Sequence, residues 1–126
     1  MPHIIVEYTD NIKSDANIYN LLKKLNQVLV SKPDVFPIGG IRSRAIELND
    51  YVVADGSEND AFVHITLKIG GGRTEEQKKE TLDELFEVAK SHLQSLFEQR
   101  YLALSLDWYE FSNKTYIHTN IHERYK

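Results

Sequence analysis

Hydrophobic and polar residues alternate with two different periods along this chain, and the changes between the two predict its elements. Short runs that are dense in β-branched and aromatic residues predict strands. Longer segments whose apolar residues recur every three or four positions predict helices with one buried face. In chain order, the expected elements are a strand at 3–8, a helix at 15–30, a strand at 41–48, a strand at 61–69, a helix at 74–99 and a strand at 102–110.

The expected ends of the two helices rest on residues with known local roles. Ser14 or Asp15 can cap the first helix, because a short polar side chain accepts hydrogen bonds from its first free amides. Pro33 and Pro37 end that helix, since proline has no N–H to continue it. Residues 74–77, Thr-Glu-Glu-Gln, have the pattern of a capping box and predict the start of the second helix.

The six elements form two units of the same plan, strand, helix and strand, at about 2–48 and 61–110, followed by a tail at 111–126. A strand–helix–strand unit joins parallel strands through a crossover on one face. We therefore expect an α+β fold with a pseudo-repeated βαβ protomer, in which two helices cover one face of a four-stranded sheet. The whole chain, 1–126, is expected to form a single domain. The other face would lie open, which favours a closed ring of subunits.

Composition removes several classes of function. The chain has 126 residues, a formal net charge of -4 and no cysteine, which excludes disulfides, thiolate metal sites and cysteine nucleophiles. No basic stripe is present, so we expect no nucleic-acid partner. No apolar run approaches the ~20 residues that span a membrane, and no signal peptide is visible, so we expect a cytoplasmic protein with no membrane partner. A few locally placed arginines suit a small anionic ligand.

The second residue is the most promising source of chemistry. Methionine before a small residue is normally removed, so the mature chain should begin at Pro2. A terminal proline carries a secondary amine with a free lone pair, which can act as a base or a nucleophile. Attached to a strand that begins at once, this amine would also be held in place, unlike most chain ends.

Three arginines can complete such a site. Arg42 and Arg44 have period-two spacing, so both side chains lie on one face of their strand. Arg73 lies just before a helix, where a cation is misplaced unless an anion sits between it and the helix amides. Arginine beside the amine would lower its pKa and would bind a carboxylate through two hydrogen bonds. Taken singly, each arginine also fits an ordinary surface or ion-pair position.

The remaining motifs give little evidence for a nucleotide or metal site. Residues 70–74, Gly-Gly-Gly-Arg-Thr, lack the spacing and the lysine of a phosphate-binding loop. His118 and His122 are four residues apart, but the segment has no helical pattern and no third ligand nearby, so we expect no metal site.

Four segments together resemble a known family, the 5-carboxymethyl-2-hydroxymuconate isomerases of the tautomerase superfamily, whose members have an amino-terminal proline. The segments are PHIIVE at 2–7, GGIRSR at 39–44, the turn Ala54-Asp55-Gly56 and AFVHITLKIGGGR at 61–73. The resemblance implies a tautomerase-like homotrimer that needs no cofactor or metal. It also implies conversion of 5-carboxymethyl-2-hydroxymuconate to its 2-oxo-3-ene isomer, in the degradation of homoprotocatechuate (4-hydroxyphenylacetate).

By the same resemblance, Pro2 is the catalytic base that shuttles a proton, and Arg42 and Arg73 bind carboxylates of a di- or tricarboxylate substrate. Arg44, adjacent on the same strand face, ranks below them as a substrate-binding residue. Two alternatives stay open. One is a tautomerase that acts on a different dienol or oxo acid, and the other is a non-catalytic trimeric protein that binds small anions.

Overall fold

Four strands form one mixed sheet in the computed structural model, which describes residues 1–126. The strands are β1 (His3–Thr9), β2 (Arg42–Leu48), β3 (Ala61–Gly70) and β4 (Leu102–Phe111), and their order across the sheet is β2-β1-β3-β4. β1 pairs with β2 in parallel, and β3 pairs with β4 in parallel, so both predicted βαβ units are confirmed. The two units meet at an antiparallel pair, β1 with β3.

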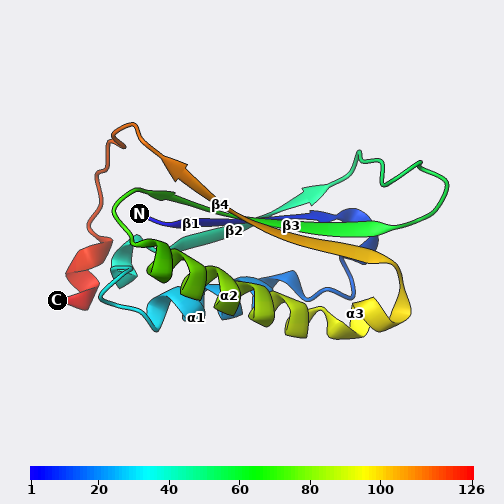
Figure 1. Ribbon diagram of the computed structural model, residues 1–126, viewed down its shortest axis with the longest axis horizontal. Helices are drawn as coiled ribbons and strands as arrows, with labels where there is room; N and C mark the ends of the chain where they lie inside the picture. Colours follow the sequence, from blue (N-terminus) through cyan, green and yellow to red (C-terminus); the bar gives the residue numbers. More distant parts are fainter.

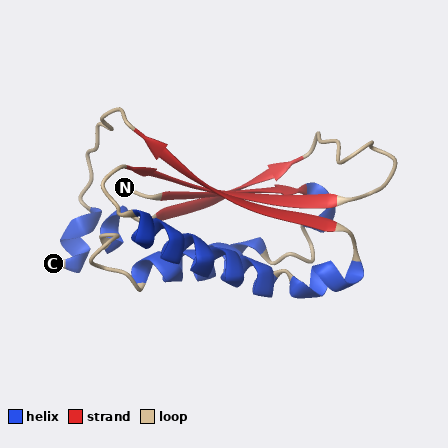
Figure 2. Ribbon diagram, in the orientation of Figure 1, coloured by secondary structure: helices blue, strands red, loops and turns tan.

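All the long helices lie on one face of this sheet, as predicted, and the other face is uncovered (Figures 1 and 2). They are α1 (Ile18–Val30), α2 (Glu75–His92) and α3 (Gln94–Gln99). Short 3₁₀ turns η1 (Asp10–Ile12), η2 (Ile38–Gly40) and η3 (Ile121–Tyr125) complete the chain.

The core lies between the helices and the alternate strand residues that face them. In β3 every second side chain, from Ala61 to Ile69, is at most 1% exposed. Leu21, Leu25 and Leu85 meet this layer from the helices and are fully buried. Each such side chain contributes about 1.5–3 kcal/mol of hydrophobic stabilisation, so this layer fixes which face of each strand points outward.

The first helix begins later than predicted. It starts at Ile18 rather than 15, and neither Ser14 nor Asp15 caps it. The residue before it, Asn17, has φ 49°, and its side chain makes no capping hydrogen bond. Residues up to Ala16 belong instead to the preceding turn, in which Ala16 N donates to the Ile12 carbonyl at 2.9 Å and Ala16 is 2% exposed.

The second helix, predicted as one element at 74–99, is two. Leu93 interrupts the helical backbone with φ -94° and ψ 6°, and α3 continues from the next residue. Leu93 is still 1% exposed, so the apolar pattern runs unchanged across the break and cannot reveal it. The predicted capping box is confirmed, because Thr74 Oγ1 accepts a hydrogen bond from Gln77 N at 3.0 Å and Thr74 N donates to Gln77 Oε1 at 2.9 Å.

The beginning of β1, the end of β3 and the C-terminal segment lie at the same end of the molecule, and the loop at 49–60 lies at the opposite end (Figure 1). The C-terminal η3 packs on η2 through a close contact. A Cβ atom on Gly39 would lie only 2.5 Å from Nδ1 of His122, so the imidazole ring rests directly on the glycine backbone.

Replacing Thr74 by alanine should lower the free energy of unfolding by about 1 kcal/mol, because the first amides of α2 lose their acceptor. Urea unfolding followed by circular dichroism measures this change. Thr74→Ser keeps the hydroxyl and serves as the matched control, which should unfold close to the parent. Equal loss in both variants would show that the cap hydrogen bond is not what stabilises this helix start.

Candidate active site

A cavity of about 700 Å³ opens at the end of the sheet where the chain begins. Its walls come from four separate parts of the chain: the start of β1, β2, the end of β3 with the turn after it, and the end of β4 with the tail that follows it. Met1, Arg44 and Arg73 line it, and Pro2 lies buried beside it. The cavity therefore brings the predicted chain terminus together with two of the three predicted arginines.

Pro2 is held by backbone contacts rather than left free. Its carbonyl accepts a hydrogen bond from Arg42 N at 3.1 Å, which extends the β1–β2 ladder to the start of the chain. On the other side, a Cβ on Gly40 would lie 3.9 Å from Pro2 Cδ, so a bare backbone packs against the ring. These contacts fix the chain terminus relative to β2.

The electrostatic surroundings disfavour a charged amine at this end of the chain. Burial lowers the pKa of the Met1 amine, and the guanidinium groups of Arg73 and Arg42 lower it further. With Met1 in place, the nitrogen of Pro2 belongs to a peptide bond and has no basic lone pair. The basic group is then the Met1 amine, one residue further out.

Arg73 is the most firmly placed of the three arginines. Its Nη1 donates to the Gly70 carbonyl at 3.2 Å and its Nη2 to the Val35 carbonyl at 3.0 Å. The guanidinium carbon lies 5.3 Å from the centre of the Phe36 ring. Burial lowers the pKa of Arg73, and Glu110 opposes that shift. Two carbonyls and an aromatic face therefore orient this cation at the cavity wall.

Arg42 and Arg44 share the uncovered face of β2, as their spacing predicts, but they are used differently. Arg42 Nη1 donates to the Gly40 carbonyl at 3.0 Å, and the side chain adjoins the chain terminus without lining the cavity. Arg44 does line it, and its Nη1 lies 3.1 Å from Nδ1 of His3. Burial lowers the pKa of His3, as do Arg44 and Arg42, so a neutral His3 ring accepts this hydrogen bond.

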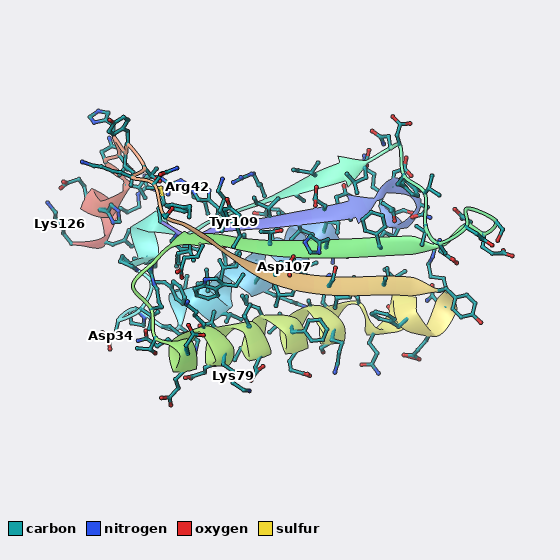
Figure 3. All side chains as sticks on the ribbon, turned by 45° about the horizontal axis from the view of Figure 1, so that its top comes forward. Asp34, Arg42, Lys79, Asp107, Tyr109 and Lys126 are labelled. Atoms are coloured by element: carbon teal, nitrogen blue, oxygen red, sulfur yellow. The ribbon has the colours of Figure 1, made fainter.

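Sequence reasoning missed His3, Lys68, Tyr109 and Phe111 as lining residues, together with most of the tail at 112–117. Lys68 Nζ lies 5.9 Å from the centre of the Tyr109 ring. Figure 3 shows Tyr109 and Arg42 at the end of the sheet nearest the C-terminal segment, with Asp107 further along β4. The alternation within 61–69 puts Lys68 on the uncovered face, but only the strand order brings it beside His3.

No group of three or more histidine and acidic side chains is placed to hold a metal ion. No helix has the length and apolar content that crossing a membrane requires.

Comparison with known proteins gives one consistent result. The family model for 5-carboxymethyl-2-hydroxymuconate isomerase matches residues 2–125. A 5-carboxymethyl-2-hydroxymuconate Delta-isomerase of Escherichia coli is 40% identical over 127 residues, which is 100% of both chains. The crystal structure of a 5-carboxymethyl-2-hydroxymuconate isomerase from Deinococcus radiodurans R1 is 53% identical, with a TM-score of 0.95 over 99% of this chain and 94% of that one.

A more distant structure shares the fold alone. It is described as "Q0 fused 4-OT wild type symmetric trimer", is 20% identical and has a TM-score of 0.64, with 94% of this chain and 92% of that chain covered. The predicted tautomerase-like α+β fold is thereby confirmed.

Replacing Arg73 by glutamine should raise the pKa of the amine at the chain terminus, because a cation that disfavours the ammonium form is removed. Titration of the labelled terminal nitrogen by NMR measures the shift. Arg44→Gln is the matched control: Arg44 acts on His3 and not on the amine, so this variant should raise the pKa of His3 instead. The same amine pKa in the parent and in Arg73→Gln would contradict the electrostatic coupling.

Proposed function

Because the chain belongs to the 5-carboxymethyl-2-hydroxymuconate isomerase family, we propose that it converts 5-carboxymethyl-2-hydroxymuconate to its 2-oxo-3-ene isomer, with Pro2 as the catalytic base. The observation that carries this proposal is the position of the chain terminus, which adjoins a cavity of about 700 Å³ within electrostatic reach of Arg73 and Arg42. The reaction belongs to aromatic compound catabolism, in the degradation of homoprotocatechuate (4-hydroxyphenylacetate).

The proposed mechanism begins with removal of Met1, which turns the Pro2 nitrogen into a secondary amine. Neutral Pro2 takes the proton of the substrate's 2-hydroxyl group, so the O–H bond breaks and a dienolate forms. The protonated Pro2 then returns the proton to carbon 5, where a C–H bond forms as the 2-oxo group and the 3-ene appear. The lowered pKa of the Met1 amine, one residue away, supports the first step, because only a neutral amine accepts a proton.

The arginines have two proposed roles. Arg73 and Arg42 bind substrate carboxylates, and their positive charge stabilises the dienolate as it forms. Arg73 suits this role because two of its five N–H groups hold it to backbone carbonyls and three are left for a ligand. Arg44, which lines the same cavity, is a further substrate-binding residue. These steps need no cofactor.

We also propose that the working enzyme is a closed homotrimer. The uncovered sheet face carries large exposed apolar side chains, among them Ile46 and Tyr109. A second apolar surface, a groove of about 610 Å³ lined by Phe86, Phe97 and Leu104, lies between the helices and the edge strand β4. Such surfaces are usually covered in an assembly, and the distant relative is described as a symmetric trimer.

Protein that retains Met1 should isomerise the dienol at least about 100-fold more slowly than trimmed protein, because a peptide nitrogen cannot act as a base. Intact mass spectrometry defines the two samples, and ultraviolet absorbance follows the reaction. Treatment of the untrimmed sample with an aminopeptidase should restore turnover, and Pro2→Ala in trimmed protein should lose most of it while keeping its fold. Equal activity with and without Met1 would refute the proline mechanism, whereas no turnover in either sample would favour a non-catalytic binding protein.

Sedimentation should give a mass of about three times the 14.6 kDa of one chain at micromolar concentration. The trimer is stabilised because neighbouring protomers cover the apolar groove of each chain. If the measured mass is that of one chain at these concentrations, the trimer is refuted. That result would not bear on the proline mechanism.

A further inference from the structure

A row of four polar side chains crosses the sheet beside the cavity, and three of them, His3, Lys68 and Tyr109, line it. His3 pairs in register with Arg42 on one side and with Lys68 on the other, and Lys68 pairs with Tyr109 on β4. Directly paired residues point to the same side of a sheet. All four side chains therefore stand in one line on the uncovered face. Arg44, one step along β2, reaches back to His3 at 3.1 Å and adds a further positive charge.

No acidic side chain neutralises this row. Arg42, Arg44, Arg73 and Lys68 form no salt bridge, although six other lysines do. The nearest acidic residue on the same face of β4, Asp107, contacts His64 at 3.4 Å instead. Unpaired cations around one cavity repel one another, and an anion bound among them would remove that repulsion. This charge pattern suits a ligand that carries several negative charges.

Lys68 is the member of this row that the proposed function does not use. Its side chain is exposed at the cavity, and its ammonium group lies over the Tyr109 ring at 5.9 Å. The ring face attracts the ammonium group and limits where it goes. Arg73, by contrast, follows β3 and lies next to the chain terminus, and its hydrogen bond to the Gly70 carbonyl holds it at that end of the cavity. Two separate cationic positions thus face one cavity.

The proposed substrate has one carboxylate beyond those of a simple muconate, in its carboxymethyl group. We propose that Lys68, positioned by Tyr109, binds this third carboxylate and makes the site select tricarboxylates over dicarboxylates. The inference rests on the proposed function for the identity of the substrate. The cationic position itself follows from the strand register and the cavity, and it can be tested without turnover.

Calorimetry with two unreactive acids tests this selectivity in the trimmed, full-length protein. Propane-1,2,3-tricarboxylate and glutarate share a chain and differ by one carboxylate. We expect the parent to prefer the tricarboxylate, and Lys68→Gln to bind it about tenfold more weakly with glutarate unchanged, because one charge-assisted hydrogen bond is lost. Lys68→Arg keeps the charge and should keep the preference.

Lys23→Gln is the matched control. Lys23 is an exposed lysine whose ammonium group also lies over a tyrosine ring, that of Tyr19 at 5.5 Å, but on the helix side, away from the cavity. The Lys23→Gln variant loses the same charge as Lys68→Gln, and it should bind both acids as the parent does. Equal weakening of both acids in Lys68→Gln, no weakening of either, or no preference in the parent would overturn the inference.

Kinetics with two dienols separate this inference from the proposed function. For 5-carboxymethyl-2-hydroxymuconate, Lys68→Gln should raise KM about tenfold with kcat near that of the parent. For 2-hydroxymuconate, which lacks the carboxymethyl group, both constants should stay unchanged. A parent that isomerises neither dienol refutes the proposed function, and the calorimetric preference then still decides whether Lys68 forms a carboxylate site. An equal loss on both dienols refutes the role of Lys68 alone.

Discussion

The parallel pairing of β1 with β2 is the constraint on which the rest of this site depends. Pairing begins at His3 and Arg42, and one further hydrogen bond, from Arg42 N to the Pro2 carbonyl, carries the ladder to the start of the chain. Chain ends are usually loose, but here the same strand that presents Arg42 also holds the terminus beside it. The distance between a terminal amine and its neighbouring cation is therefore set by backbone geometry rather than by a flexible side chain.

The second determinant is charge. Cations from β2, β3 and the turn before α2 converge on one cavity, and none of them forms a salt bridge. This arrangement costs the unliganded protein some stability, because cations with no paired carboxylate face the same cavity. Together with burial, Arg73 and Arg42 also lower the pKa of the Met1 amine. One distribution of charge thus disfavours an ammonium ion at the chain terminus and favours an anion in the cavity.

The sequence predicted what depends on local pattern and missed what depends on neighbours in space. Alternation and helical spacing predicted both βαβ units, the capping box at Thr74 and the shared face of Arg42 and Arg44. The break at Leu93 left no trace, because the residue stays buried and apolar. Lys68 was missed for a different reason. It lies beside His3 because β1 and β3 pair antiparallel where the two units meet, and the spacing of apolar residues within either unit does not predict that pairing.

The contact between Gly39 and His122 has a consequence for how such a pocket can diversify. The tail at 112–117 forms one wall of the cavity, and just beyond it the chain is latched by an imidazole ring resting on bare backbone. A methyl group at position 39 would displace the His122 ring without altering a charged residue at the cavity. The width of the cavity at this wall and its electrostatic potential are therefore set by different residues, so one can change while the other is kept.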